Sequence, residues 1–444
     1  DGIVTVTMDM SGPVNAMNAE YRTAMGATVD RLECEEGLTG VVLASAKKVF
    51  FAGGDLNDLL AVTADRAQDF MNEVTLVKSH LRRLEQLPVP VVAAINGAAL
   101  GGGFEICLAC NHRVAWNDRS VQIGLPEVGL GLLPGGGGIV RLVNLIGLER
   151  ALPYLLEGKK IAPAKALDEG MVDELVGSVE ELVPRAKAWI MDNKDNEAAA
   201  VQPWDTKGYR IPGGDARSPK LAQTIMAAPA MLLQQTRGLL PAPERILSCA
   251  VEAARLKFDT ALVIESRGLV HLATTPQAKN MISTFFFGMN KVNGGASRPE
   301  AYERYTTRKV GVLGAGMMGQ GIAYVSAMAG IDVVLKDVSE DAARKGKAYS
   351  AALLDKRVDR GRMSPQQREE ILERITPTAD NADLQGCDLI IEAVFENIDL
   401  KEKVIAETFP KLAPGGIYGS NTSTLPISIL AEACPEPELS LIHI

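Results

Sequence analysis

Two glutamates follow glycine-rich segments in the first third of the chain, in a pattern suited to acid–base chemistry. Glu105 ends the segment Ala99-Leu100-Gly101-Gly102-Gly103-Phe104-Glu105, and Glu127 ends Gly124-Leu125-Pro126-Glu127. Two carboxylates around one water can divide the roles of base and acid. Each glutamate taken alone is equally well explained as a helix cap or a turn residue. We therefore predict a catalytic pair provided that the fold brings the two residues together.

Glycine-rich turns beside these glutamates offer backbone amides to an oxyanion. The glycines at 101–103 follow an apolar strand and open the helix that carries Glu105, which allows a ligand to approach the backbone closely. Upstream, Ala52-Gly53-Gly54-Asp55 is a second small-residue turn after a strand. The amides of Gly54 and Gly102 are candidates to bind one carbonyl oxygen and stabilise an enolate. Loss of one such donor typically costs about 10²–10³ in rate.

A further glycine-rich turn has the pattern of a pyrophosphate site. The segment Gly314-Ala315-Gly316-Met317-Met318-Gly319 follows the apolar run 310–313 and precedes an apolar helix. Asp337 ends the next predicted strand, about 20 residues beyond the glycines, where a carboxylate binds the ribose of NAD in preference to NADP. The alternative is a plain strand–turn–helix. The pattern predicts an NAD-binding unit that begins near residue 307.

The elements that must position these residues fall into three stretches. Up to about residue 190, short β-branched runs alternate with helical patterns, which predicts stacked βαβ units. Residues 191–306 begin with a Gly/Pro-rich loop and continue as Ala-rich helices without a chemical motif. A breaker at 293–299 precedes the second parallel-sheet unit. We expect an α/β protein with domains at 1–190 and 307–438, joined by a helical linker at 191–306.

Composition excludes several classes of protein. The 444 residues are 47% hydrophobic and 23% charged, enough for two or three domains with full cores. A net charge of -9 argues against nucleic acid as a partner. The six cysteines and four histidines show no metal-binding spacing, so we expect buried thiols and no metal site. The most apolar stretch, 89–110, includes Asn96 and Glu105, so we expect no transmembrane segment, and without an export signal we expect a cytoplasmic protein.

Four blocks in the first stretch resemble the enoyl-CoA hydratase (crotonase) family. They are residues 52–55, 100–105, 124–127 and Leu133-Pro134-Gly135-Gly136-Gly137-Gly138. The resemblance covers residues 1–190 and implies a trimer-forming ββα spiral in which the amides of Gly54 and Gly102 hold the thioester oxygen of an acyl-CoA. It implies that Glu105 activates the water added to a trans-2-enoyl-CoA and that Glu127 delivers a proton to the α-carbon. Gly54 stands where alanine is commoner, and the amide is retained.

Residues 307–438 resemble 3-hydroxyacyl-CoA dehydrogenases, through the glycine-rich turn and the segments 388–397 and 420–427. Both stretches in this order resemble the α-subunit of the fatty-acid β-oxidation multienzyme complex. The resemblance implies hydration followed by NAD-dependent oxidation to a 3-ketoacyl-CoA, with a thiolase β-subunit as partner. It also implies contacts to NAD or to the substrate by Gly314, Ala315, Gly316, Met317, Met318, Gly319, Asp337, Val394, Phe395, Glu396, Lys401 and Ser423.

The last six residues depart from that family. Leu439-Ser440-Leu441-Ile442-His443-Ile444 replaces an expected strand that carries a catalytic histidine, and His443 falls one residue early. A slip of one residue on a strand turns a side chain to the opposite face. We predict that residues 439–444 are a non-native tail, that the Rossmann-type domain is incomplete and that its dehydrogenase is inactive.

Three function classes stay open on the sequence. The first is a β-oxidation protein with a working hydratase. The second is a Δ3-Δ2 enoyl-CoA isomerase, in which Glu127 alone shuttles a proton. The third is a non-catalytic assembly subunit that docks a thiolase and holds NAD. Homo-oligomerisation also stays open.

Overall fold

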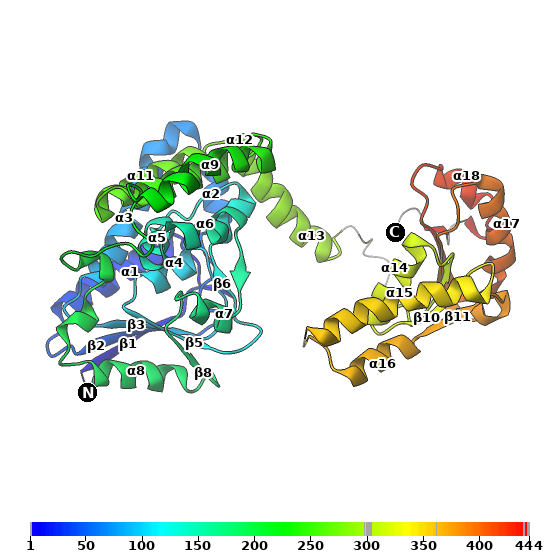
Figure 1. Ribbon diagram of the computed structural model, residues 1–444, viewed down its shortest axis with the longest axis horizontal. Coiled ribbons are helices and arrows are strands. Elements are labelled where there is room, and N and C mark those ends of the chain that lie inside the picture. Colours follow the sequence, from blue (N-terminus) through cyan, green and yellow to red (C-terminus); the bar gives the residue numbers. More distant parts are fainter. Residues whose placement is uncertain (1, 297, 299–303, 361, 438–439, 442–444) are drawn as a thin grey trace. The chain divides into compact units, whose positions relative to one another are not determined.

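Parallel strands followed by helices build both halves of the chain (Figure 1). The computed structural model describes residues 2–296, 298, 304–360, 362–437 and 440–441. Contacts divide the chain into a first unit, residues 1–298, and a second unit, residues 299–444. Each unit is described by itself.

The first unit is built on a five-stranded parallel sheet. Its strands at 40–45 and 91–95 are apolar and almost wholly buried, as expected when helices cover both faces. Helix α8 (Leu182–Asp192) packs Leu182, Ala186 and Ile190 against one face, below the sheet in Figure 1. In spatial order the strands are β1 (Ile3–Met8), β2 (Gly40–Ser45), β3 (Val91–Ile95), β5 (His112–Trp116) and β8 (Glu174–Val176).

A small second sheet joins the segments that carry Glu105 and Glu127. Strand β4 (Ala99–Leu100) pairs in parallel with β6 (Ile123–Gly124), so Leu100 lies opposite Gly124. Helix α4 (Gly102–Leu108) follows β4, and a 3₁₀ turn, η2 (Pro126–Leu130), follows β6. Strand β7 (Lys160–Ile161) completes this sheet on the far side of β6.

Helices on the other face of the main sheet complete the core of the first unit. Helix α1 begins where the Asn18 side chain accepts a hydrogen bond from the Tyr21 amide. The apolar residues of α3 recur at helical spacing and face the core. These helices are α1 (Ala19–Cys34), α2 (Leu56–Ala61), α3 (Ala67–Glu85), α5 (Gly138–Ile146), α6 (Leu148–Glu157) and α7 (Pro163–Asp168).

The helical region after residue 200 packs onto this same core. Ile246, Leu262 and Leu272 belong to the hydrophobic cluster that also contains Leu81 and Val140. The rings of Trp204 and Phe258 stack with centroids 4.9 Å apart. The elements of this region are α9 (Pro219–Thr236), α10 (Pro241–Ala253), α11 (Phe258–Ala273), α12 (Pro276–Met281), a π-helix (Ile282–Gly288) and α13 (Met289–Asn293).

The second unit is a six-stranded parallel sheet of the Rossmann type. Two apolar clusters, one around Val312 and Ala323 and one around Ile390 and Ile405, form its core. In spatial order its strands are β11 (Ile375–Thr378), β10 (Asp332–Lys336), β9 (Lys309–Leu313), β12 (Cys387–Glu392), β13 (Leu412–Ser420) and β14 (Ser440–Leu441). Its longer helices are α14 (Met317–Met328), α15 (Glu340–Asp359), α16 (Pro365–Glu373) and α17 (Ile398–Thr408), and α18 (Ile427–Ala431) follows β13.

This strand order reverses between β9 and β12, which defines a crevice at the carboxyl ends of the strands. The expected α/β class, with a helical middle and a Rossmann-type unit, is confirmed. Strand β14 pairs with β13 through Tyr418 and Gly419. His443, the residue on which the predicted tail depends, lies outside the described residues.

Candidate active site

The two glutamates lie at one end of α4. Gly101, which precedes α4, has a φ of 54°, a conformation that glycine adopts without strain. A Cβ added at Gly101 would lie 2.7 Å from the Glu127 Oε1 atom, so this glycine lets Glu127 approach the helix start. Glu105 stands in the first turn of the same helix. The structure therefore brings the two predicted carboxylates to one place.

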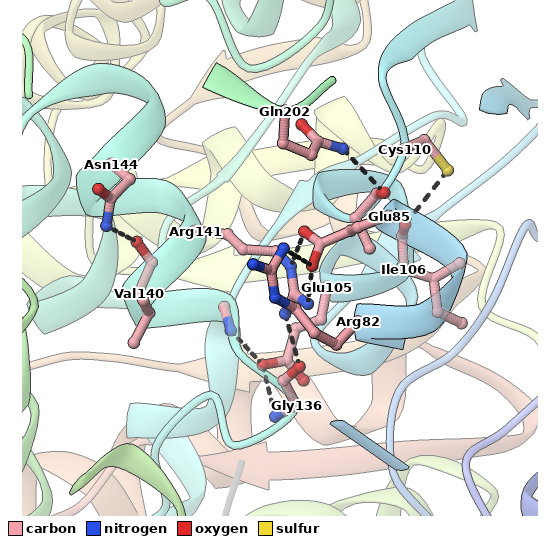
Figure 2. Close-up of polar contacts among 12 residues, drawn as sticks. Arg82, Glu85, Glu105, Ile106, Cys110, Gly136, Val140, Arg141, Asn144 and Gln202 are labelled. Atoms are coloured by element: carbon pink, nitrogen blue, oxygen red, sulfur yellow. Dashed lines mark hydrogen bonds and ion pairs between the residues drawn. The ribbon is translucent and has the colours of Figure 1, made fainter. Parts of the chain in front are cut away.

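Glu105 is buried and held by a glycine loop. Its side chain is 2% exposed, and its Oε1 atom accepts hydrogen bonds from the amides of Gly136 and Gly138, each at 2.7 Å (Figure 2). Burial, followed by the negative charge of Glu265, raises the pKa of Glu105 to about 7. A carboxyl group with this pKa is a suitable general base near neutral pH.

Glu127 is held differently. Its Oε2 atom is buried and has no hydrogen-bond partner among the described residues. Burial, and then the charge of Glu105, raises the pKa of Glu127 well above its usual range. The raised pKa favours the protonated form of Glu127, which is the form in which a carboxyl group acts as an acid.

The turn at Gly53 and Gly54 lies beside the start of α4. Gly53 has a φ of 98°, and a Cβ added there would lie 3.8 Å from the Gly102 nitrogen. Gly54 and Gly102 line the same cavity as the two glutamates. In the described part of the chain, neither the Gly54 nor the Gly102 amide donates to a protein acceptor. Two amides at one cavity wall are suited to an oxyanion.

The cavity has a volume of about 360 Å³ and two kinds of wall. Its apolar wall is suited to a hydrocarbon chain. Charged side chains from α1, α2 and α3 line it as well. Among them, Arg22 forms ion pairs with Asp58 and with Glu73. The apolar wall is formed by Phe70, Val74, Val77, Leu132, Leu133 and Leu269.

Two buried ion pairs behind this cavity were not predicted from the sequence. Arg141 and Glu85 are joined at 2.7 and 2.9 Å, and Arg141 also donates to the Gly136 carbonyl at 2.9 Å (Figure 2). Lys78 and Glu265 are 2.8 Å apart. A signal was present, because Lys78 and Glu85 interrupt the apolar face of α3. Charged residues on such a face require partners inside the protein.

In the second unit, the predicted glycine turn lies at the crevice. Gly314 has a φ of 91°, and a Cβ there would lie 2.7 Å from the Ala393 carbonyl oxygen. Asp337 accepts a hydrogen bond from the Ala315 amide at 2.6 Å. Among the described residues, the amides of Gly316, Met317 and Met318 have no acceptor. Free amides at the start of a 12-residue helix fit the pyrophosphate of a dinucleotide.

The remaining predicted residues of the second unit divide into exposed and buried groups. The Phe395 side chain is 86% exposed, and Val394 is only partly buried. Lys401 is fully buried, with its Nζ atom 2.8 Å and 2.9 Å from the Glu392 oxygens and 3.4 Å from Glu396. Its ammonium group is therefore directed into the protein.

Glu396 connects Lys401 to the turn that contains Ser423. Its Oε1 atom accepts hydrogen bonds from the Thr422 hydroxyl at 2.6 Å and the Ser423 amide at 2.9 Å. The hydrogen bond from Thr422 is the main cause that lowers the pKa of Glu396 to about 2. Glu396 thereby fixes the backbone next to Ser423.

Clusters of metal ligands, exposed thiols and long apolar helices would indicate other functions. The described residues contain no group of three or more His, Cys, Asp or Glu side chains that could hold a metal ion. Cys34 is exposed, and the other five cysteines are buried. Within the same residues, no helix combines the length and the apolar character needed to cross a membrane.

Fold and site together define a chain with a carboxylate-and-amide active centre followed by a dinucleotide-binding unit. Residues 1–204 match the enoyl-CoA hydratase/isomerase family, and residues 309–443 match the NAD-binding domain of 3-hydroxyacyl-CoA dehydrogenases. The two matches, in this order, are consistent with a fused fatty-acid oxidation enzyme.

Solved structures of both kinds are similar to parts of the chain. An enoyl-CoA hydratase from Bacillus anthracis is 26% identical, with 57% of this chain and 86% of that chain covered and a TM-score of 0.39. One from Bacillus halodurans is 21% identical, with coverage of 64% and 96% and a TM-score of 0.45. An (S)-3-hydroxybutyryl-CoA dehydrogenase from Ralstonia eutropha is 35% identical, with coverage of 30% and 48% and a TM-score of 0.30. The chain therefore spans about half the length of that dehydrogenase.

Proposed function

We propose that the first unit hydrates a trans-2-enoyl-CoA to a 3-hydroxyacyl-CoA. The observation that carries this proposal is the meeting of Glu105, Glu127 and the amides of Gly54 and Gly102 at one cavity. The catalytic module is assigned to residues 1–190. The helical region at 191–306 and the NAD-binding module at 307–438 complete the proposed domain plan.

The proposed reaction uses the two carboxyl groups in opposite states. Ionised Glu105 takes a proton from water as the water oxygen bonds to the β-carbon. The electron pair of the double bond moves toward the thioester, whose oxygen the Gly54 and Gly102 amides hold. Protonated Glu127 then delivers its proton to the α-carbon. The raised pKa of Glu127 and the pKa of Glu105 near 7 support this division.

In the same proposal, the second unit binds NAD for oxidation of the 3-hydroxy product. The amides at 316–318 would hold the pyrophosphate, and Asp337 the ribose, while NAD supplies the hydride acceptor. The remaining proposed contacts to NAD or to the substrate are Val394, Phe395, Glu396, Lys401 and Ser423. The departure at residues 439–444 predicts that this oxidation does not occur in this chain.

The test is mass spectrometry of the full chain incubated with a medium-chain trans-2-enoyl-CoA and NAD. Addition of one water, lost in Glu105→Gln and in Glu127→Gln, is the expected result. Unchanged substrate with folded protein would refute the hydratase and favour the assembly subunit. Formation of a 3-ketoacyl-CoA would refute the predicted inactivity of the dehydrogenase.

Isomerisation is the second candidate, because the unpartnered, protonated Glu127 can shuttle a proton without a bound water. Incubation of Glu105→Gln with a 3-enoyl-CoA separates the two activities. A hydratase loses water addition in this variant, whereas an isomerase that uses Glu127 alone retains double-bond migration. A thiolase β-subunit is the proposed protein partner, and co-purification with this chain tests the pairing.

A further inference from the structure

Two carboxylates meet at the start of helix α5, and they come from distant parts of the sequence. The Gly138 amide donates to Glu105 at 2.7 Å, and the Val140 amide donates to Glu265 at 3.0 Å. Glu265 belongs to α11, in the helical region that lies outside the matched hydratase family. Free amides and the helix dipole make this end of α5 favourable for negative charge.

Glu265 is fixed from its other side by Lys78. The Lys78 ammonium lies 2.8 Å from Glu265 and donates to the Leu262 carbonyl at 2.7 Å. Glu265 is 0% exposed and Lys78 is 5% exposed. One Glu265 oxygen thus accepts from the Val140 amide and the other lies in the ion pair with Lys78, which restricts the position of the carboxylate.

Neither buried cation near Glu105 is paired with it. Lys78 is paired with Glu265, and Arg141 with Glu85. Glu105 therefore ionises beside a negative charge that its own partners offset only in part. The titratable groups that interact with Glu105 or Glu265 are Tyr21 of α1, Lys78 of α3, Glu127 of η2, Arg141 of α5 and Cys249 of α10.

We infer that Glu265 is a positioning residue for the proposed hydration, holding the α5 start and a fixed negative charge beside the base Glu105. This inference rests on the proposed function and deepens it. The helical region then contributes to the catalytic centre as well as to the core. The polar partners of Glu265 are the Val140 amide and Lys78, and Glu265 does not line the cavity, so it acts through Glu105 and not on the substrate.

The direction of its effect follows from charge. The negative charge of Glu265 opposes ionisation of Glu105 more strongly than Lys78 favours it. Removal of Glu265 should therefore allow Glu105 to ionise at lower pH. The direction of this change in the pKa of Glu105 is the same whether Lys78 stays charged or becomes neutral when Glu265 is removed. Burial lowers the pKa of Lys78 and so favours its neutral form.

The test uses Glu265→Gln, in which the amide oxygen still accepts from Val140, and the double variant K78M/E265Q, which leaves no unpaired lysine. We would measure kcat/KM for hydration of a trans-2-enoyl-CoA from pH 5 to pH 9, with circular dichroism to verify folding. The acidic limb should move to lower pH by on the order of one unit in Glu265→Gln, and by less in K78M/E265Q, in which the positive charge of Lys78 is lost as well. Glu244→Gln, an exposed glutamate on α10, is the matched control and should leave the limb unmoved.

A purely structural role would lower kcat at every pH and leave the acidic limb in place. That outcome in a folded variant, with an active wild type, would overturn this inference and leave the proposed function intact. An inactive wild type would overturn both. The double variant also retains the test if the single variant, with its unpaired buried lysine, does not fold.

Discussion

Glu105 and Glu127 are identical in chemistry and differ in surroundings. Glu105 accepts two amide hydrogen bonds that favour its charge, whereas one oxygen of Glu127 has no partner in the described structure. Burial acts on both. The amide hydrogen bonds, together with the charges of Lys78 and Arg141, favour the ionised form of Glu105.

The first prediction concerns the pH dependence of the proposed hydration. Because Glu105 must be ionised and has a pKa of about 7, kcat/KM should rise with pH through about 7. Because Glu127 must be protonated and its pKa is raised well above its usual range, kcat/KM should fall again at higher pH. Initial rates across a pH series give the profile. A flat profile between pH 5 and pH 8 would contradict these roles.

The same shift has a consequence for stability. The pKa of Glu105 is about 7 in the folded protein and near the usual 4.3 in the unfolded chain. The folded state therefore binds this proton more tightly than the unfolded chain does. The contribution of Glu105 to the free energy of unfolding is complete below about pH 4 and is lost as the pH rises through 7.

Glu105→Gln cannot lose a proton and should escape this penalty. Relative to the wild type, its free energy of unfolding should increase by about 3 kcal/mol between pH 4 and pH 9. Urea unfolding of both proteins at the two pH values measures the change. A difference that is the same at both pH values would refute the buried, raised state of Glu105.

At the residue scale, the sequence indicated the two candidate carboxylates but not the buried residues that surround them. Glu105 and Glu127 were identifiable because glycine turns lie next to them in the sequence. Glu265 was not, because nothing near it in the sequence indicates that it approaches Val140. Lys401 is named through a motif match as a contact to NAD or the substrate, which stays a prediction, and in the structure its ammonium binds Glu392.

At the scale of elements, the start of α4 depends on a residue without a side chain. Gly101→Ala would place a Cβ 2.7 Å from the Glu127 oxygen in a backbone conformation unfavourable for alanine. We expect a loss of about 1–3 kcal/mol in unfolding free energy and a large loss of hydration. Thermal unfolding and the hydration assay measure both effects.

Gly129→Ala is the matched control for this substitution. Gly129 lies in η2, two residues after Glu127, and a Cβ there would meet no atom within 4 Å. Its stability should change by less than about 0.5 kcal/mol. Equal effects at positions 101 and 129 would show that the close approach of Glu127 to Gly101 is unimportant.

Arg141 connects α3, α5 and the glycine loop that holds Glu105. Arg141→Met leaves buried Glu85 with Arg82 alone, at 3.4 Å, so we expect a loss of about 3 kcal/mol in the unfolding free energy. The double variant E85Q/R141M removes the buried charge and should recover part of this loss. Denaturant unfolding of the set gives the coupling energy. If stability recovers and hydration does not, the ion pair with Glu85 serves stability, and the hydrogen bond from Arg141 to the Gly136 carbonyl serves the proposed hydration.

At the scale of the whole molecule, the two units have separate cores. We expect two calorimetric transitions, and NAD should raise only the one that belongs to residues 299–444. At a concentration of 100 Kd the stabilisation is about 2.7 kcal/mol. Asp337→Ala should reduce this shift at the same NAD concentration. An NAD-dependent shift of the first unit, or of neither unit, would contradict the assignment.

The sequence predicted local architecture well and distant packing poorly. The apolar runs before Gly101 and Gly314 mark strands because short β-branched segments bounded by glycine have few other structures. The Ala-rich helices after residue 220 carry no motif, and their contacts with Leu81 and Val140 depend on surfaces that only the folded chain presents. The helical region was therefore predicted as a linker, whereas its apolar residues share the core of the first unit.

The hydrogen bond from Lys78 to Leu262 joins residues 184 positions apart, and this separation orders events during biosynthesis. At about 5–20 residues per second, a ribosome makes Lys78 roughly ten to forty seconds before α11. Until then the nascent chain carries a lysine destined for the interior without its counter-ion, and α5 has only one of its two carboxylates. Completion of the catalytic pocket must therefore wait for a segment translated well after the last residue of the hydratase signature.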